Sequence, residues 1–134
     1  MAASRDTDAA VVKPLEGAIV QRFTAGAAIQ AGEIVSMSSD GYIDPAIATG
    51  VVLSAVGIAL PNKGGDPASA AGDAVDVVTH GPVLCMAGAT IGGLIYVSDT
   101  AGEPSESAGT KDTVIGFAQS ATVLFVRPQI IDFT

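Results

Sequence analysis

The sequence predicts an all-β fold, a compact β-barrel or sandwich built from two related β-modules with an extended N-terminal arm. Apolar residues make up 49% of the 134 residues, in short runs rich in Val and Ile that favour strands. Gly and Pro turn signals separate these runs at a spacing of roughly 8–12 residues, which is typical of sandwiches and barrels. No stretch has the helical pattern that a βαβ unit would need.

The first 22 residues are the segment that we expect to form the arm. Residues 1–10 are small, polar and unpatterned, which is typical of a disordered chain end. Pro14 and Gly17 then prevent a long helix, so an extended lead-in is expected before a strand at residues 18–23. The arm is therefore predicted to be partly disordered and to contact a neighbouring chain.

The β domain, residues 23–134, should contain a series of short strands bounded by turn residues. In order, these strands are expected at residues 34–37, 42–43, 51–60, 74–79, 83–86, 95–98, 113–119 and 121–127. Gly57 and its β-branched neighbours favour a strand over a helix in the third of them. A turn is expected at Gly81-Pro82, and Pro128 should end the last strand.

Two stretches of the β domain repeat one pattern. Residues 25–41, AGAAIQAGEIVSMSSDG, return as residues 87–102, AGATIGGLIYVSDTAG. The anchors are separated by roughly 60 residues, as expected for a duplicated module with small loop deletions. They pair Gly26 with Gly88, Gly32 with Gly93, Gly41 with Gly102, and residues 57–59 with residues 116–118. We interpret this as an internal repeat over residues 25–60 and 87–119, with residues 61–72 as an insertion.

The net charge of −8 comes entirely from residues 23–134, because the first 22 residues are neutral. An acidic body argues against nucleic acid as a partner, which is bound through Lys and Arg. It also argues against docking on anionic membranes. No apolar run is long enough to span a bilayer, and the charged N-terminus does not resemble a signal peptide.

The residues that could carry chemistry do not form a catalytic pattern in the sequence, so we expect no enzymatic activity. The single histidine, His80, and the single cysteine, Cys85, cannot assemble a zinc site, and the apolar run around Cys85 indicates a small buried side chain. Carboxylates lie singly at turns, without a calcium-binding loop pattern, although a site between turns stays open. The glycine-rich stretches lack a phosphate-binding context. We expect no catalytic, metal-binding or cofactor-binding residues.

An ordered set of motifs runs along residues 25–127. It comprises A-G-x-x-I-x-A-G-x-x-V, D-G, V-G-I-A, G-D-x-V-x-V-x-x-x-G, a second A-G-x-x-I segment, V-I-G-x-A and a final V-x-V. They lie at residues 25–35, 40–41, 56–59, 72–81, 87–97, 114–118 and 123–126. Each motif alone is weak, but the ordered set resembles the small capsid cement, or head-decoration, proteins of tailed bacteriophages.

The resemblance implies a structural virion protein, made in the host cytoplasm and placed on the outer capsid surface. It would stabilise the shell by bridging subunits of the major capsid protein, as a homotrimer that carries an arm onto the shell. It implies no enzymatic activity and no cofactor. The expected capsid-contacting residues are Val11, Val12, Pro14 and Leu15, because this part of the neutral arm is apolar enough to add to another chain's sheet edge.

Two other classes of function remain as alternatives. A surface-adhesion or carbohydrate-binding module would share the all-β fold, but such sites usually stack sugars on Trp or Tyr, and this chain has no Trp and two Tyr. A β-clip or hammerhead-like domain attached to an enzyme would share the short Gly-bounded strands of the type G-E-I-V and G-D-A-V.

Overall fold

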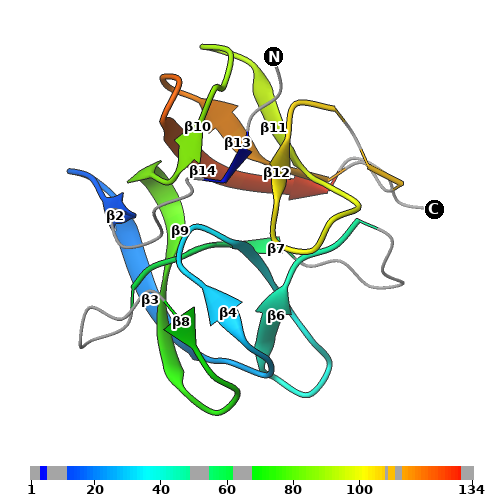
Figure 1. Ribbon diagram of the computed structural model, residues 1–134. Helices are drawn as coiled ribbons and strands as arrows, with labels where there is room; N and C mark the ends of the chain where they lie inside the picture. Colours follow the sequence, from blue (N-terminus) through cyan, green and yellow to red (C-terminus); the bar gives the residue numbers. More distant parts are fainter. Residues whose placement is uncertain are drawn as a thin grey trace.

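The computed structural model describes residues 4–5, 12–48, 55–61, 68–107, 109–110 and 113–130, and these residues form an all-β structure without helices. The main antiparallel sheet curls strongly into a half-barrel (Figure 1), and two-stranded pairs accompany it. The strands are β1 (Ser4–Arg5), β2 (Lys13–Pro14), β3 (Ile19–Thr24), β4 (Ile29–Gln30), β5 (Ile34–Met37), β6 (Ile43–Pro45), β7 (Ala55–Ala59), β8 (Ala68–Ser69), β9 (Ala74–Leu84), β10 (Met86–Ala87), β11 (Leu94–Val97), β12 (Pro104–Ser105), β13 (Thr113–Ala118) and β14 (Val123–Ile130).

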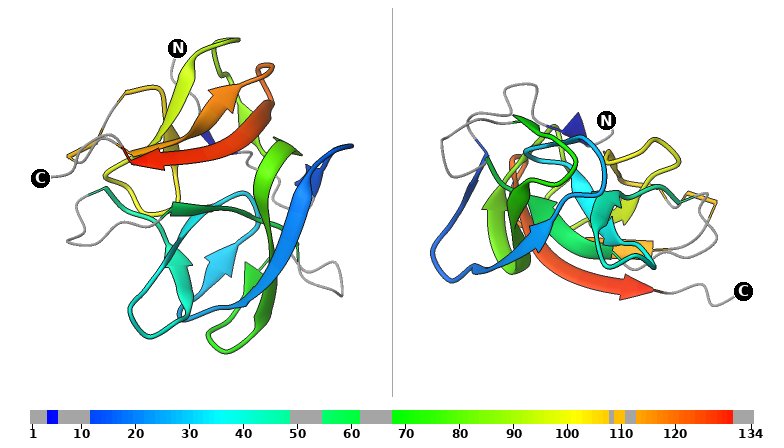
Figure 2. Two further views of the ribbon diagram at one scale, coloured as in Figure 1. Left: turned by 180° about the vertical axis from the view of Figure 1, so that it is seen from behind. Right: turned by 90° about the horizontal axis from the view of Figure 1, so that it is seen from below.

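Strand β9 joins two groups of strands, which Figure 1 shows beside its upper part and beside its lower part. Its first part pairs with β3 along one edge and with β7 along the other, so that Val78 lies between Val20 and Ile58. Its last part pairs with β2 and with β14, so that Val83 lies between Pro14 and Leu124. Figure 2 shows β3 running beside β9 in the view from behind. A single strand of 11 residues therefore belongs to both groups.

The turn expected at Gly81-Pro82 is absent, because β9 runs through both residues. Gly81 has a φ of +108°, and a Cβ there would lie 2.8 Å from the Cα of Ala18. A glycine in this conformation bends a strand and allows a neighbouring backbone to approach. The carbonyl oxygen of Pro82 still accepts a hydrogen bond from Leu15 N at 3.0 Å. The turn signal in the sequence therefore marks a bend in a continuous strand.

The prediction that Pro128 ends the last strand is also wrong. Strand β14 continues through Pro128 to Ile130, and the pairs Gln129–Val114 and Ile130–Thr113 continue its ladder with β13. The partner register shifts between Val114 and Gly116 on β13, so the ladder is already irregular next to the proline. Proline is tolerated at such irregular places because no regular ladder bond is lost there.

The main sheet has the same order of neighbours when read from either edge. One half runs β12-β11-β13-β14 and the other runs β6-β5-β7-β9, with β14 and β9 adjacent at the centre. The register of β5 against β7 shifts after Val35, and the register of β11 against β13 shifts after Ile95. The two halves therefore have equivalent strand orders and equivalent irregularities.

Local contacts also correspond between the halves, with one correction to the sequence alignment. Gly32 has a φ of +92° and donates its N–H to Ala59 O, while Gly92 has a φ of +82° and donates to Ala118 O. The structural counterpart of Gly32 is therefore Gly92, one residue before the glycine aligned with it from sequence. Counted from Gly26 and Gly88, the second stretch is therefore shorter by two residues before this turn, where the sequence alignment had allowed a gap of one.

The core is built from small and branched side chains in two clusters. The larger one fills the concave interior and takes residues from both halves, among them Ile34, Ile58, Ile95, Ile115 and Leu124. The smaller cluster lies on the opposite side of β5 and β7, where neighbouring positions on each strand point the other way; its members are Ala25, Ile29, Val35, Ile43, Ala59, Val75 and Val77.

We predict that Gly57→Ala and Gly116→Ala each destabilise the protein by about 3 kcal/mol, the upper range for overpacking. A Cβ at either glycine would lie 1.9 Å from a carbonyl oxygen, that of Val78 or of Phe125, and backbone cannot move aside easily. The matched control is Gly41→Ala, where φ is +87° but no other atom lies within 4 Å. It should cost only about 1 kcal/mol for the left-handed backbone. Urea unfolding of the three variants measures these differences, and equal losses would contradict the close approach.

Candidate partner-binding face

Five side chains form a strip across the convex face of the main sheet. The members, here called the apolar strip, are Ile19, His80, Phe125, Phe117 and Leu94, one each from β3, β9, β14, β13 and β11. Register places Ile19 opposite His80, Phe125 opposite Phe117, and Phe117 opposite Leu94. Directly opposite residues in antiparallel strands point to the same face. Between β9 and β14 the register pairs Phe125 with Pro82, and there the ring contact of His80 with Phe125 continues the strip, which thus crosses five neighbouring strands.

Ring contacts hold the middle of the apolar strip. The rings of Phe117 and Phe125 are stacked with centroids 5.2 Å apart, and His80 meets Phe125 edge to face at 5.3 Å. These are the spacings at which aromatic pairs attract each other beyond their burial. The rings therefore support one another in fixed positions on the surface.

The apolar strip faces solvent. Ile19 is 52% exposed and Leu94 is 48% exposed, while Phe117 and Phe125 are half-buried. The alternate residues Leu124 and Val126 of β14 point inward and are fully buried. The strands at the strip thus carry apolar side chains on both faces, and contiguous exposed apolar groups are typical of interaction sites.

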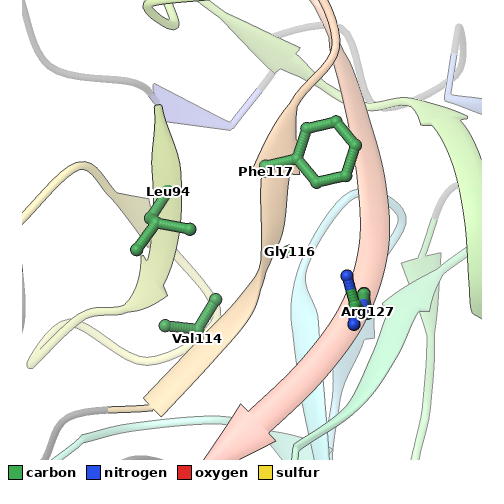
Figure 3. Close-up of a pocket in the computed structure, with 5 residues that line it drawn as sticks. All are labelled: Leu94, Val114, Gly116, Phe117 and Arg127. Carbon is green, nitrogen blue, oxygen red and sulfur yellow. The ribbon is translucent and has the colours of Figure 1, made fainter. Parts of the chain in front are cut away.

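A small pocket of about 60 Å³ opens beside the apolar strip. Figure 3 shows Leu94 and Val114 on one side of it, Phe117 and Arg127 on the other, and Gly116 between them. Because Gly116 has no side chain, the sheet surface is hollow at this point. The pocket can receive a small apolar group, with the Arg127 guanidinium at its border.

The electrostatics of this face differ from those of the whole protein. Strands β11, β13 and β14 contain no Asp or Glu, although the chain has 14 of them. Arg127 is exposed, and no ion pair joins it to a carboxylate of the described residues. Arg22 differs, because its Nε lies 2.9 Å from Asp76 Oδ1, and this hydrogen bond raises the pKa of Arg22. Within the described residues, the face around Arg127 is thus apolar, with a positive charge that no carboxylate pairs.

Three of the four residues expected to contact a capsid, Val12, Pro14 and Leu15, are described, and they differ in exposure. Val12 is 2% exposed and belongs to the larger core cluster. Leu15 is half-buried and bonded through its N–H to β9, while Pro14 is exposed in β2. Val11 lies outside the described residues. Of residues 1–10, only Ser4 and Arg5 are described, and they pair with β10 as β1.

Sequence reasoning missed the apolar strip because the contact to a partner was assigned to the N-terminal arm. One signal for it was present: the last two strands are free of acidic residues and carry Phe117 and Phe125, within a strongly acidic chain. The sequence pattern of a single strand does not show which of its faces packs against the core. The strip can therefore be recognised only once the pairing of the strands is known.

His80 and Cys85, the two residues considered for chemistry, differ in their surroundings. Cys85 is 1% exposed, as expected, whereas His80 is exposed with its ring on Phe125. Within the described ranges, no three His, Cys, Asp or Glu side chains are placed to hold a metal ion. The same part of the chain contains no helix that could cross a membrane.

Comparison with known proteins adds no relative: no family model matches the chain, and no curated protein matches it in sequence. The fold and the face define an all-β protein with an exposed apolar surface on its convex side.

We expect Cys85→Ala to lower the free energy of unfolding by about 1 kcal/mol, since it removes one buried atom from the core. Folded wild type should react with a bulky thiol reagent only as fast as it opens. Rapid stoichiometric labelling of the native protein would contradict the buried position.

Proposed function

We propose that the protein decorates the outer surface of a tailed-bacteriophage capsid and stabilises it by bridging major capsid subunits. The observation that carries the proposal is the apolar strip, an exposed surface that suits a protein partner and that crosses five strands of the sheet. The ordered motifs of residues 25–127 supply the kind of partner, through their resemblance to capsid cement proteins. In this proposal the protein acts without catalysis and without a cofactor.

The equivalent halves of the main sheet support a further part of the proposal, that the domain is a compact barrel-like body of two related β-modules. Gly57 and Gly116 make the same close approach to a carbonyl oxygen in the two halves. Duplication of one module accounts for this agreement more simply than two independent origins.

Binding would draw mainly on apolar burial, because the face contains few charges. Each square ångström of apolar surface removed from water contributes roughly 25 cal/mol. An assembled shell presents many equivalent sites, so a homotrimer of weakly binding protomers would bind firmly through simultaneous contacts. The acidic remainder of the protein would stay in solvent on the outside of the virion.

The N-terminal segment, residues 1–22, has a second role in the proposal, as a contact to a neighbouring subunit. Strand β3 pairs with β9 alone among the described strands, so its other edge is open. Its first four residues are exposed, including Ile19 at the end of the apolar strip and Val20. An open edge with apolar side chains can accept a strand from another chain.

The test is co-sedimentation with expanded, undecorated capsids. The double variant Ile19→Ser/Leu94→Ser should bind about tenfold more weakly or worse, since it removes two apolar contacts and 1.4 kcal/mol corresponds to a factor of ten. The control is Tyr42→Ser, a side chain that is 47% exposed but lies in the β5–β6 turn, away from the strip. It should bind like wild type.

The outcomes separate the parts of the proposal. Equal binding by wild type and the double variant would reject the apolar strip as the contact. Failure of wild type to bind any capsid would reject the capsid assignment and favour the carbohydrate-binding alternative. Binding should change little between low and moderate salt, because few charges are available for screening.

A further inference from the structure

We propose that the pocket beside Arg127 is a subsite for an aliphatic side chain that is followed at close range by a carboxylate, both on an extended segment of the protein partner. The inference rests on the proposed function only in that the partner is a protein. It names the chemistry that the strip would recognise, which neither the sequence motifs nor the strip's exposure specifies.

The walls of the pocket select an aliphatic group. Leu94, Val114 and Phe117 present carbon atoms to it, and Gly116 leaves room at its base. Its volume of about 60 Å³ suits the branched end of a Val, Leu or Ile side chain better than an aromatic ring. Burial there removes apolar surface on both partners from water.

The charge at the pocket border selects a carboxylate. Arg127 has five N–H donors in a planar fork that matches a carboxylate's two oxygens. No described carboxylate is paired with it, and its own strand β14 and the adjoining strands β13 and β11 contain no Asp or Glu. Arg22, by contrast, has an internal partner, because it forms an ion pair with Asp76. The positive charge on this face is therefore complementary to an acidic group that comes from outside.

The two selected groups fit a strand-like ligand. In an extended chain, residues i and i+2 point to the same side and lie roughly 6.6 Å apart. An aliphatic residue in the pocket would then place a carboxylate at i+2 toward Arg127, which itself lines the pocket. A sugar offers no branched aliphatic group, so this pairing favours a peptide over the carbohydrate alternative.

The experiment is a ¹⁵N-¹H correlation titration of the full chain with 4-methylpentanoate, which carries both groups. The matched probe is 4-methylpentanamide, which has the same aliphatic end and no charge. The carboxylate should shift the amide signals of Leu94, Gly116 and Phe117 and bind at least about fivefold more tightly than the amide, since one charge-assisted hydrogen-bond pair is lost.

Two variants test whether the tighter binding of the carboxylate probe depends on Arg127. Arg127→Gln should bring the carboxylate's affinity down to that of the amide, while Arg22→Gln, which alters an exposed arginine already paired with Asp76, should leave it unchanged. Both side chains are exposed, so both variants should fold, as the same spectra report. Equal affinity for the two probes, or full affinity in Arg127→Gln, would overturn the subsite.

The result is separable from that of the capsid experiment. If the strip variant loses capsid binding but 4-methylpentanoate does not bind the pocket, the subsite is overturned and the decoration role stands. A pocket that binds the probe as expected in a protein that binds no capsid would overturn the decoration role and leave the subsite. The subsite would also be overturned if the probe shifted amide signals across β5, β6 and β7 and not those of Leu94, Gly116 and Phe117.

Discussion

The pairing of β9 on both of its edges is the constraint on which the rest of the structure depends. A strand that joins two halves of a curled sheet must change direction without losing its backbone hydrogen bonds, since buried unpaired groups are costly. Gly81 makes this possible, because it alone at this point can adopt a φ of +108° and admit the backbone of Ala18. The curl of the sheet, the concave core and the convex face all follow from that bend.

The sequence was sufficient for the fold class and for most strands, because Gly and Pro punctuation and β-branched runs are local signals. Residues 34–37 form a strand with the bounds expected for it, and Cys85 is buried as its apolar neighbours indicated. The failures occur where a residue's role depends on a distant partner. Gly81-Pro82 has the local chemistry of a turn, but pairing with β2 and β14 keeps the chain extended.

The candidate site was less predictable than the fold for the same reason. Val12 looks like an arm residue in sequence, yet it fills a place in the core that only the folded sheet creates. The apolar strip takes one residue from each of five strands, and its members become neighbours only through the pairing of strands that are distant in sequence. The acidic charge of the chain offsets the solubility cost of such a surface, since net charge opposes self-association.

The long-range pairing of β9 also has a consequence for how the protein is made. The partners of this strand lie far away in both directions, from Lys13 in β2 to Val126 in β14. On a ribosome, β3, β5, β7 and the first part of β9 can meet early. The contact between β9 and β14 at the centre of the sheet cannot form until β14, which follows β10 to β13 in the chain, has emerged. Until then the inner face of the first half is exposed, and such non-local closure is slow. The nascent protein would therefore depend on its acidic charge, or on a chaperone, during that interval.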